Sequence, residues 1–577
     1  MKIQKFWIVL VILLSLSAKK TSAVSEISSQ NNKFGIHLAT SSKKELLDAA
    51  SLVNQYGDWG YITVVIQEND RNYQKWQDAF DQMRQLHLIP IVRIASSPDG
   101  DCWRSPDPAQ TDSWVDFLDS LHWVVKNRYI VLFNEPNHGS EWGKKVDPES
   151  YAQVVVSFSK ALKERSADFF VMMAGFDAAA PNSPPLYEDE AVFLGKMDKS
   201  IEGGLSKLFE NLDGWASHSY PNHGFVGSPL ATGRNSIKTY LWELDLLRSF
   251  GVEKDLPVFI TETGWPHFEG INSQKGLFSA DKVAQNFSVY FDQVISDSRV
   301  VAVTPFILDY QSEPFDHFSW KKPGTETEFY PQYEQVKGVK KVVGNPVQEQ
   351  NFSIENSLPD KLIKDSTYTI PIVIENQGQA IWDKEDGYQL GLLGDTQDLE
   401  YFFSDFSNLS PFGQSVLQLH LKLTGDEGEK EVKIAIFKNG QEVFSGFPWN
   451  FKVMPAVDLS LKVDLFPKLK TSSDDFTLLI FNDRQEVVFE KTNLEVSTGR
   501  GLVTDIHNVI IGKNYRVVVL KPGYLPRQQI IVLEREGNEA VLETMFPVDF
   551  NQDGRFSFSD IYTLIKNPSL IRILWLK

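Results

Sequence analysis

The sequence holds a single cysteine, Cys102, among its 577 residues. One thiol cannot form an intramolecular disulfide, so a small scaffold stapled by cross-links is excluded and the chain depends on its apolar cores. Basic residues are also in deficit, at 57 against 76 acidic residues, which gives a net charge of −19. That balance repels polyanions and anionic surfaces, so we predict no nucleic-acid partner.

Long apolar runs are scarce as well. The run at the N-terminus, from Phe6 to Leu16, is shorter than the roughly 20 residues that a membrane-spanning helix needs. With Lys2 and Lys5 before it and the small residues Thr21 to Ala23 after it, this segment is typical of a secretory signal. We predict a signal peptide over 1–23 and a secreted or cell-surface protein. An uncleaved N-terminal anchor is the alternative, and without it we expect no integral membrane span.

Between residues 33 and 335, short apolar or β-branched runs alternate with segments of helical periodicity, as in repeated βα units. Eight such runs are present, and eight parallel strands close a TIM barrel. We therefore predict an α/β fold with a (β/α)8 barrel over 33–335. The predicted strands are Phe34 to Ala39, Tyr61 to Ile66, Ile89 to Ala95, Tyr129 to Phe133, Phe169 to Ala174, Gly214 to Ser219, Pro257 to Thr261 and Val300 to Leu308.

Helix boundary signals agree with this alternation. Residues 42–45 (Ser-Lys-Lys-Glu) match a capping box, in which each end residue bonds the backbone of the other. Asp147 before Pro148 is the pattern of a cap followed by the first helical position, and Gly251 is placed to end the helix that precedes it.

After about residue 345 the pattern changes to alternating strands and tight-turn pairs such as Asn439-Gly440, with no long helical period. We predict two all-β sandwiches, over 346–455 and 456–545, with Lys337 to Pro346 as a short linker from the barrel. The first resembles an immunoglobulin-like spacer of cell-surface proteins, and carbohydrate binding is its functional alternative. The last segment, 546–577, carries a metal-binding pattern described below.

Two glutamates follow predicted strands directly. Strand four runs into Asn134-Glu135-Pro136, and strand seven runs into Glu262 and Trp265. Because active sites of such barrels lie at the carboxyl ends of the strands, both carboxylates are expected to face one pocket.

A pair of carboxyl groups is what hydrolysis of a glycosidic bond requires. One group protonates the leaving oxygen, and the other meets the positive charge that develops on the sugar. A separation of about 5 to 5.5 Å gives retention by double displacement, whereas about 6.5 to 9.5 Å gives inversion. The sequence leaves that separation open.

Together, the motif around Glu135 after strand four and the motif around Glu262 after strand seven resemble the two signatures of glycoside hydrolase clan A, a group of retaining (β/α)8 glycosidases. The resemblance covers the barrel and not the β domains. It implies that Glu135 is the general acid/base, that Asn134 contacts the 2-hydroxyl of the substrate, and that Glu262 is the nucleophile.

Other polar residues fall at predicted strand ends. The segment His218-Ser219-Tyr220-Pro221 follows strand six, where clan members similarly place a His or Tyr that orients the nucleophile. Arg93 and His37 lie near the ends of strands three and one and complete the expected polar floor. For these last two, a structural role at the barrel end is an equally open alternative.

Aromatic side chains stack on the flat C–H faces of sugar rings, so Trp265 beside the nucleophile is a predicted substrate platform. Burial in the barrel wall is the rival interpretation. Further candidate platforms near loops are Trp59, Trp103, Trp142 and Trp320.

Residues 549–560 follow the spacing of a calcium-binding loop, with oxygen ligands at positions 1, 3 and 5, Gly at 6 and an acid at 12. The pattern resembles one half of a dockerin type I module. Since we find one loop where a full module has two, we favour a structural calcium clip over binding of a cohesin-type partner. The predicted metal residues are Asp549, Asn551, Asp553, Arg555, Ser557 and Asp560.

These features predict a retaining glycoside hydrolase that acts on β-linked oligo- or polysaccharides and uses no cofactor for catalysis. Two alternatives remain open. A transglycosylase would use the same two glutamates with a sugar as acceptor, and a catalytically silent surface barrel would bind glycans or mediate adhesion without positioned acids.

Overall fold

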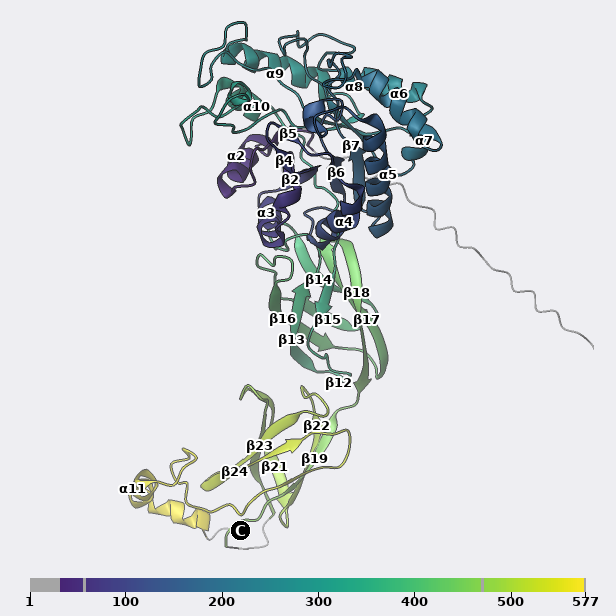
Figure 1. The fold of residues 1–577 in the computed structure, drawn as a ribbon. Helices are drawn as coiled ribbons and strands as arrows, with labels where there is room; N and C mark the ends of the chain where they lie inside the picture. The colour runs from purple at the N-terminus through teal and green to yellow at the C-terminus, as the bar shows by residue number, and fades with distance from the viewer. Residues whose placement is uncertain (1–31, 56–58, 468–471, 575–577) are drawn as a thin grey trace, which may run out of the picture. The chain divides into compact units, whose positions relative to one another are not determined.

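The computed structural model describes residues 32–55, 59–467 and 472–574 (Figure 1). The predicted signal peptide over 1–23 lies outside this range. Among the described residues, no helix is both long and apolar enough to cross a membrane. The chain divides into two compact units, Met1–Glu349 and Gln350–Lys577.

In its described part, the first unit contains eight parallel strands in two sheets, ordered β1-β2-β3-β6-β7 and β10-β9-β8. Parallel bridges from Phe34 to Val303 and from Met172 to Gly214 join the edges of the two sheets into a ring. The strands fall on the predicted runs, although the last ends at Val303 and not at Leu308. They are β1 (Gly35–His37), β2 (Gly60–Gln67), β3 (Leu88–Ala95), β6 (Arg128–Leu132), β7 (Phe169–Met173), β8 (Trp215–His218), β9 (Val258–Glu262) and β10 (Val300–Val303).

Helices lie around the outside of this ring (Figure 1). Asp147 caps one of them through the backbone N–H of Ser150, with Pro148 as its first residue, and Gly251 follows another with a φ of 80°, as the sequence predicts. The helices are α2 (Lys43–Val53), α3 (Tyr73–Gln85), α4 (Thr111–Ser120), α5 (Pro148–Arg165), α6 (Glu190–Ser200), α7 (Gly204–Leu208), α8 (Thr239–Ser249), α9 (Ala280–Val294) and α10 (Pro331–Lys337). Shorter elements are η1 (Glu68–Asp70), β4 (Pro98–Asp99), β5 (Cys102–Trp103), η2 (Pro108–Gln110), η3 (Gly139–Glu141) and η4 (Asp316–Phe318).

Four aromatic side chains fill the ring near the amino ends of its strands. The Tyr129 ring lies 5.1 Å from that of Phe259 and 5.2 Å from that of Phe170, and the Tyr61 ring lies 6.2 Å from that of Tyr129. All four are buried. The interior of the ring is therefore a packed core that is closed at the amino ends of the strands. Polar groups at the carboxyl ends face away from this core.

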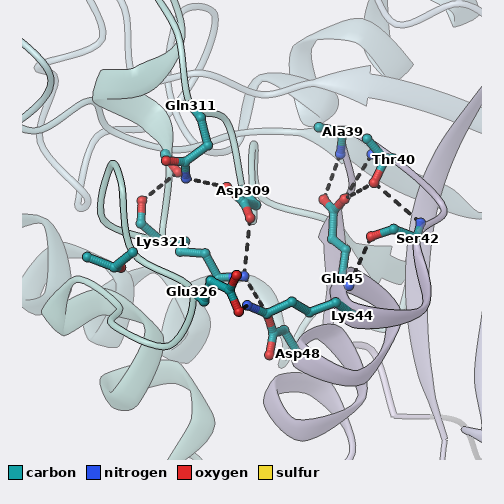
Figure 2. Close-up of polar contacts among 12 residues, drawn as sticks. Ala39, Thr40, Ser42, Lys44, Glu45, Asp48, Asp309, Gln311, Lys321 and Glu326 are labelled. Carbon is teal, nitrogen blue, oxygen red and sulfur yellow. Dashed lines mark hydrogen bonds and ion pairs between the residues drawn. The ribbon is translucent and has the colours of Figure 1, made fainter.

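The predicted capping box at α2 forms only in part. Ser42 Oγ accepts a hydrogen bond from Glu45 N at 3.3 Å, as expected. The Glu45 carboxylate does not bond the Ser42 backbone; it accepts from Ala39 N and Thr40 N, each at 2.9 Å, and from the Thr40 hydroxyl (Figure 2). The loop after β1 offers these donors to the buried Glu45 carboxylate, so Glu45 fixes that loop as well as the helix start.

The second unit begins with two four-stranded sheets in the described range, ordered β11-β13-β16-β15 and β12-β18-β17-β14. They enclose one apolar cluster that includes Trp382 and Trp449. Asn439 and Gly440, both with positive φ, link β17 to β18 as predicted. The strands are β11 (Phe352–Ile354), β12 (Lys361–Ile363), β13 (Thr367–Asn376), β14 (Tyr388–Gly394), β15 (Leu399–Phe403), β16 (Gln414–Leu423), β17 (Gly428–Lys438) and β18 (Gln441–Met454).

The remaining strands form a single seven-stranded sheet among the described residues, and not the pair of sheets expected of a second sandwich. It curls around its own apolar cluster, and a short α11 (Phe558–Lys566) and η5 (Pro568–Leu574) follow. The order β24-β23-β20-β21-β22-β19-β25 comprises β19 (Val457–Lys462), β20 (Ser472–Phe481), β21 (Val487–Ser497), β22 (Arg500–Ile506), β23 (Asn514–Lys521), β24 (Tyr524–Val532) and β25 (Asn538–Val541).

Candidate active site

Glu135 and Glu262 converge at the carboxyl end of the ring. Glu135 follows β6 by three residues, and Glu262 is the last residue of β9. One oxygen of each carboxylate lies within 4.8 Å of the other, and both lie within that distance of His218 Nδ1. The two glutamates predicted from strands four and seven therefore share one site.

The backbone that presents Glu135 is strained. Phe133 has a φ of 72° and Glu135 a φ of 27°, values that side chains with a Cβ rarely adopt. Glu135 N donates to Gly175 O at 3.1 Å, which ties this segment to the end of the next strand. Strain of this kind costs about 1 to 3 kcal/mol per residue and is concentrated at functional sites.

Glu262 is held by three neighbours. Arg93 Nη1 donates to its Oε1 at 2.5 Å, Tyr220 Oη donates to its Oε2 at 3.2 Å, and His37 Nε2 lies 3.7 Å from its Oε1. Burial would raise the pKa of Glu262, but the positive charges of His218 and Arg93 outweigh it and lower that pKa to about 2. The Glu262 carboxylate is therefore ionised and is held in one orientation by its neighbours.

Tyr220 reaches Glu262 as a neutral phenol. Burial and the negative charge of Glu262 both raise the pKa of Tyr220 well above its ordinary value, so the hydroxyl stays a donor. The same burial lowers the pKa of His37 to about 3, and this imidazole is neutral at physiological pH.

His218 lies closer to Glu135 than to Glu262. Its Nδ1 is 2.8 Å from Glu135 Oε1 and 3.8 Å from Glu262 Oε2. Burial lowers the pKa of His218, but the charge of Glu262 and the hydrogen bond with Glu135 outweigh it and raise that pKa above its ordinary value. The sequence predicted that the strand-six motif orients the nucleophile; in the structure Tyr220 contacts Glu262 and His218 bonds Glu135.

Asn134 joins the two halves of the site. Its Oδ1 accepts from Arg93 Nη1 at 2.5 Å, the same nitrogen that donates to Glu262. The predicted residues His37, Arg93, Asn134, Glu135, His218, Tyr220 and Glu262 are thus brought together by the ends of five strands.

Two further residues were missed by the sequence reasoning. His138 Nδ1 lies 3.9 Å from Glu135 Oε2, and its Nε2 lies 2.9 Å from Asp177 Oδ2. Glu141 ends η3 three residues after His138, and burial together with the negative charge of Glu135 raises its pKa to about 7. Both lie in the turn just after Glu135, where no period or motif in the sequence distinguishes them.

The prediction that Trp265 is a sugar platform is wrong. Its side chain is 2% exposed, packs edge-on against Phe287 and Tyr290, and donates its indole N–H to Gly227 O at 2.9 Å. Trp59, Trp142 and Trp320 are also buried, and only Trp103 of the candidates named is partly exposed. A tryptophan next to a site residue in the sequence can pack into the barrel wall as readily as it can face the pocket. The sequence alone does not give the direction of its side chain.

A partly exposed aromatic residue does lie beside the site. The Phe306 ring is 5.2 Å from the His37 ring, edge to face, and Phe306 N donates to Thr263 O next to Glu262. Phe306 falls within the run predicted as strand eight, just past the point where β10 ends.

The geometry of Glu135, His218 and Glu262 would also allow three ligands to one metal ion. However, the Arg93 guanidinium already contacts Glu262 at 2.5 Å, and a second cation at that oxygen would be repelled. The arrangement is better suited to proton transfer and nucleophilic attack. A cavity of about 340 Å³ at the opposite end of the ring, beside Pro257 and Arg299, contains none of the predicted site residues.

The C-terminal loop presents a separate set of oxygen atoms. The buried carboxylate of Asp549 accepts from the backbone N–H groups of Asp553 and Gly554, and that of Asp560 accepts from Asn551 and Ser557. Asp560 also completes a capping box with Ser557 at the start of α11. Among the described residues, Asp549, Asp553 and Asp560 do not form a set in which one oxygen of each lies within 4.8 Å of both others.

Comparison with known proteins gives only weak matches. No family model and no curated protein matches the chain. Among solved structures, a monomeric beta-xylosidase from Caulobacter crescentus CB15 has a TM-score of 0.37 and 11% identity, covering 84% of this chain and 98% of its own.

Two other solved structures are similarly distant. A GH39 enzyme from Xanthomonas axonopodis pv. citri has a TM-score of 0.35 and 11% identity, over 70% of this chain and 96% of its own. AbfB, a family 51 alpha-L-arabinofuranosidase from Bifidobacterium longum, has a TM-score of 0.37 and 10% identity, over 84% and 95%. Similarity this low assigns no family.

Proposed function

We propose that the first unit is a (β/α)8 barrel and that the protein is a retaining glycoside hydrolase acting on β-linked glycans. The observation that carries this proposal is the approach of Glu135 and Glu262 to within 4.8 Å through one oxygen of each. So close an approach of one oxygen pair agrees with the short carboxyl separation of a retaining enzyme, in which one carboxylate attacks directly.

In the first step Glu262 attacks the anomeric carbon while Glu135 gives its proton to the leaving glycosidic oxygen. The carbon–oxygen bond to the leaving group breaks, and an ester between the sugar and Glu262 forms. In the second step Glu135 takes a proton from water, the water oxygen attacks the anomeric carbon, and Glu262 leaves as a carboxylate. Each glutamate thereby returns to its starting state.

The surroundings of the two carboxyl groups support different roles. Arg93 and Tyr220 stabilise negative charge on Glu262, as a nucleophile requires. Glu135 instead contacts the imidazoles of His218 and His138, groups that exchange protons near neutral pH. Asn134, by its likeness to the clan A motif, would contact the substrate 2-hydroxyl.

The proposal is tested by a screen of β-linked glycans and aryl β-glycosides with wild type and Glu262→Ala. We expect the variant to lose roughly 10⁴- to 10⁶-fold in kcat, the scale seen when a covalent nucleophile is deleted. Added azide should restore turnover of an activated aryl glycoside and yield a glycosyl azide of inverted configuration. Glu149→Ala, an exposed acid on α5, is the matched control.

No activity of wild type across the panel would contradict the proposal and would favour a silent glycan-binding barrel. Transfer of the glycosyl group to a sugar acceptor, with little free sugar released, would identify a transglycosylase with the same two residues.

For the rest of the chain we propose export to the cell surface or medium, with the first β domain as a spacer and calcium in the loop 549–560. The ion would take side-chain oxygens of Asp549, Asn551, Asp553, Ser557 and Asp560 and the backbone carbonyl of Arg555. There it would hold the start of α11 and take no part in hydrolysis. The oxygen-only donor set fits calcium, and a cohesin-type partner is not part of the proposal.

A further inference from the structure

The two carboxylate oxygens of Glu135 have different neighbours. Oε1 lies 2.8 Å from His218 Nδ1, a hydrogen-bond distance, whereas Oε2 lies 3.9 Å from His138 Nδ1, which is too far for a hydrogen bond. His218 therefore occupies Oε1 and leaves Oε2 as the oxygen that carries the acidic proton. The glycosidic oxygen of a substrate has to come within about 2.6 to 3.2 Å of Oε2 to receive that proton.

His138 faces the same space from the turn after β6. Its Nε2 is bonded to Asp177 Oδ2 at 2.9 Å, and among the described residues its Nδ1 makes no hydrogen bond. The imidazole side chain is 20% exposed. His138 therefore has one nitrogen that is held by the protein and one that is available to a ligand beside Oε2.

Asp177 holds this imidazole in one orientation. Its Oδ1 accepts from Ala179 N at 2.8 Å, and the fully buried Asn137 donates from Nδ2 to the backbone oxygens of Asp177 at 2.9 Å and Glu188 at 3.1 Å. These bonds tie the turn after β6 to the segment after β7. The position of His138 is thus fixed by the ends of neighbouring strands and does not depend on a substrate.

A partly exposed aromatic ring lies beside His138. The Tyr187 side chain is 38% exposed, and its ring lies 4.9 Å from the imidazole, edge to face. The backbones of the two residues form an antiparallel bridge, and Gly139 N donates to Leu186 O at 2.7 Å. A phenol ring of this kind suits a ligand that has both apolar C–H faces and hydroxyl groups.

Nδ1 of His138 can bond a hydroxyl in either protonation state of the ring. Burial lowers the pKa of His138, but the hydrogen bond with Asp177 and the negative charge of Glu135 outweigh it and raise that pKa above its ordinary value. A charged ring offers an N–H donor at Nδ1, and a neutral ring that donates to Asp177 from Nε2 offers a lone pair there. A sugar hydroxyl both donates and accepts, so it matches both forms.

The bond that breaks joins the protonated oxygen to the carbon attacked by Glu262, so the leaving group extends from that oxygen away from Glu262. A sugar leaving group has hydroxyls next to that oxygen, and an aryl leaving group has none there. We infer that His138, held by Asp177 and bordered by Tyr187, binds the leaving sugar through a hydrogen bond between Nδ1 and a hydroxyl beside the glycosidic oxygen. The inference rests on the proposed glycosidase function, and it makes a sugar the preferred leaving group.

The test compares wild type and His138→Ala on three substrates that share one glycone: an oligosaccharide of the glycan found active, a para-nitrophenyl glycoside and an unsubstituted phenyl glycoside. The measured quantity is kcat/KM, because it reports the steps up to departure of the leaving group. For the oligosaccharide, His138→Ala should lower kcat/KM by about 10- to 100-fold, the scale of a lost hydrogen bond to a charged group. Both aryl glycosides should lose less than about 3-fold, since they offer Nδ1 no hydroxyl.

Two conservative variants separate the roles of the two nitrogens of His138. Asparagine places its amide near the position of Nδ1, so His138→Asn should recover part of the loss on the oligosaccharide. Glutamine reaches Asp177 and leaves the position of Nδ1 empty, so His138→Gln should lose as much as His138→Ala. Thermal melting establishes that each variant folds, and Ser140→Ala, exposed on the same turn, should behave as wild type.

An equal loss on all three substrates would overturn the inference, because a structural role of His138 affects every substrate. A loss shared by the oligosaccharide and the phenyl glycoside would also overturn it and would assign His138 to proton donation, on which the nitrophenyl leaving group depends least. An unchanged kcat/KM on the oligosaccharide would overturn it as well. If His138→Ala does not fold, His138→Gln carries the same comparison.

Failure of the proposed function is a different outcome. In that case wild type itself is inactive on all three substrates, and the inference about His138 falls with it.

Discussion

Gly175 leaves the space that the His218 imidazole occupies. A Cβ built on Gly175 would lie 2.2 Å from His218 Cδ2 and 2.6 Å from its Nε2, far inside van der Waals contact. The backbone at Gly175 has a conformation that any residue can adopt, since its φ is not among the positive values. The missing side chain at Gly175 therefore makes room for the His218 imidazole and is not required by the backbone φ.

Gly175→Ala should displace His218 from Glu135 without unfolding the protein. The hydrogen bond between His218 and Glu135 would be lost, and hydrogen bonds to charged groups contribute about 1.5 to 3 kcal/mol, so kcat/KM should fall by roughly 10- to 150-fold. Steady-state kinetics alongside His218→Ala check this, and the two variants should lose similar factors. Wild-type activity in Gly175→Ala would show that catalysis does not need His218 in its position beside Glu135.

Arg93→Met should move the acid limb of the pH–rate profile. Because the Arg93 charge helps to lower the pKa of Glu262 to about 2, removing it lets that pKa rise towards its ordinary 4.5. Glu262 then takes up a proton at a higher pH, and the limb should shift upward by about one to two pH units. Profiles of kcat/KM from pH 2 to 7 measure the shift, with Arg165→Met on the surface of α5 as control. An unchanged limb would mean that Arg93 does not hold Glu262 ionised.

Two lysines near the loop after β1 should differ sharply in their effect on stability. Lys321 is buried between Asp48 and Asp309, whereas Lys44 pairs with Glu326 in solvent (Figure 2). Lys321→Met would leave the partly exposed carboxylates of Asp48 and Asp309 without their cation, and the loss of charged hydrogen bonds of this kind costs about 1.5 to 3 kcal/mol. Lys44→Met should cost no more than about 1 kcal/mol.

Urea denaturation of both variants gives the comparison between the two lysines. Equal losses of unfolding free energy would contradict the assignment of Lys321 as the cation that ties α2 to the loop around Asp309.

Calcium should bind the C-terminal loop and leave hydrolysis unchanged. Isothermal titration of the chelator-treated chain with CaCl₂ should show binding that Asp549→Ala abolishes, because position 1 of the loop provides an essential oxygen. Asp483→Ala, an exposed acid in a β-turn, should bind as wild type does. The proposal fails if titration detects no binding, or if EDTA removes glycosidase activity.

The ring strands were predictable because parallel strands buried on both faces appear in sequence as unbroken apolar runs. The predicted runs that end at Phe133 and Thr261 each end within one residue of β6 and β9, and this placed Glu135 and Glu262 at one edge. The last strand was predicted too long because residues 305–308 remain apolar, and because Thr304 N still bonds Ile260 O in β9 and Phe306 N bonds Thr263 O just after it.

The partners of those carboxylates were only partly predictable. The sequence predicted that His218 and Tyr220 lie in the site. It did not predict which of the two glutamates each one contacts, because that depends on the direction of the side chain at a strand end. The prediction for Trp265 was wrong for the same reason, because its ring points into the barrel wall. Nothing in the sequence indicated that Glu141 lies in the site, because the position of this turn depends on the packing of Trp142 behind it.

Double displacement through Glu262 is tested most directly by proton NMR of the first sugar released. With a β-linked substrate, retention predicts the β-anomer as initial product, with the α-anomer growing only as mutarotation proceeds. Initial release of the α-anomer would show single displacement by water, and it would contradict the assignment of Glu262 as nucleophile.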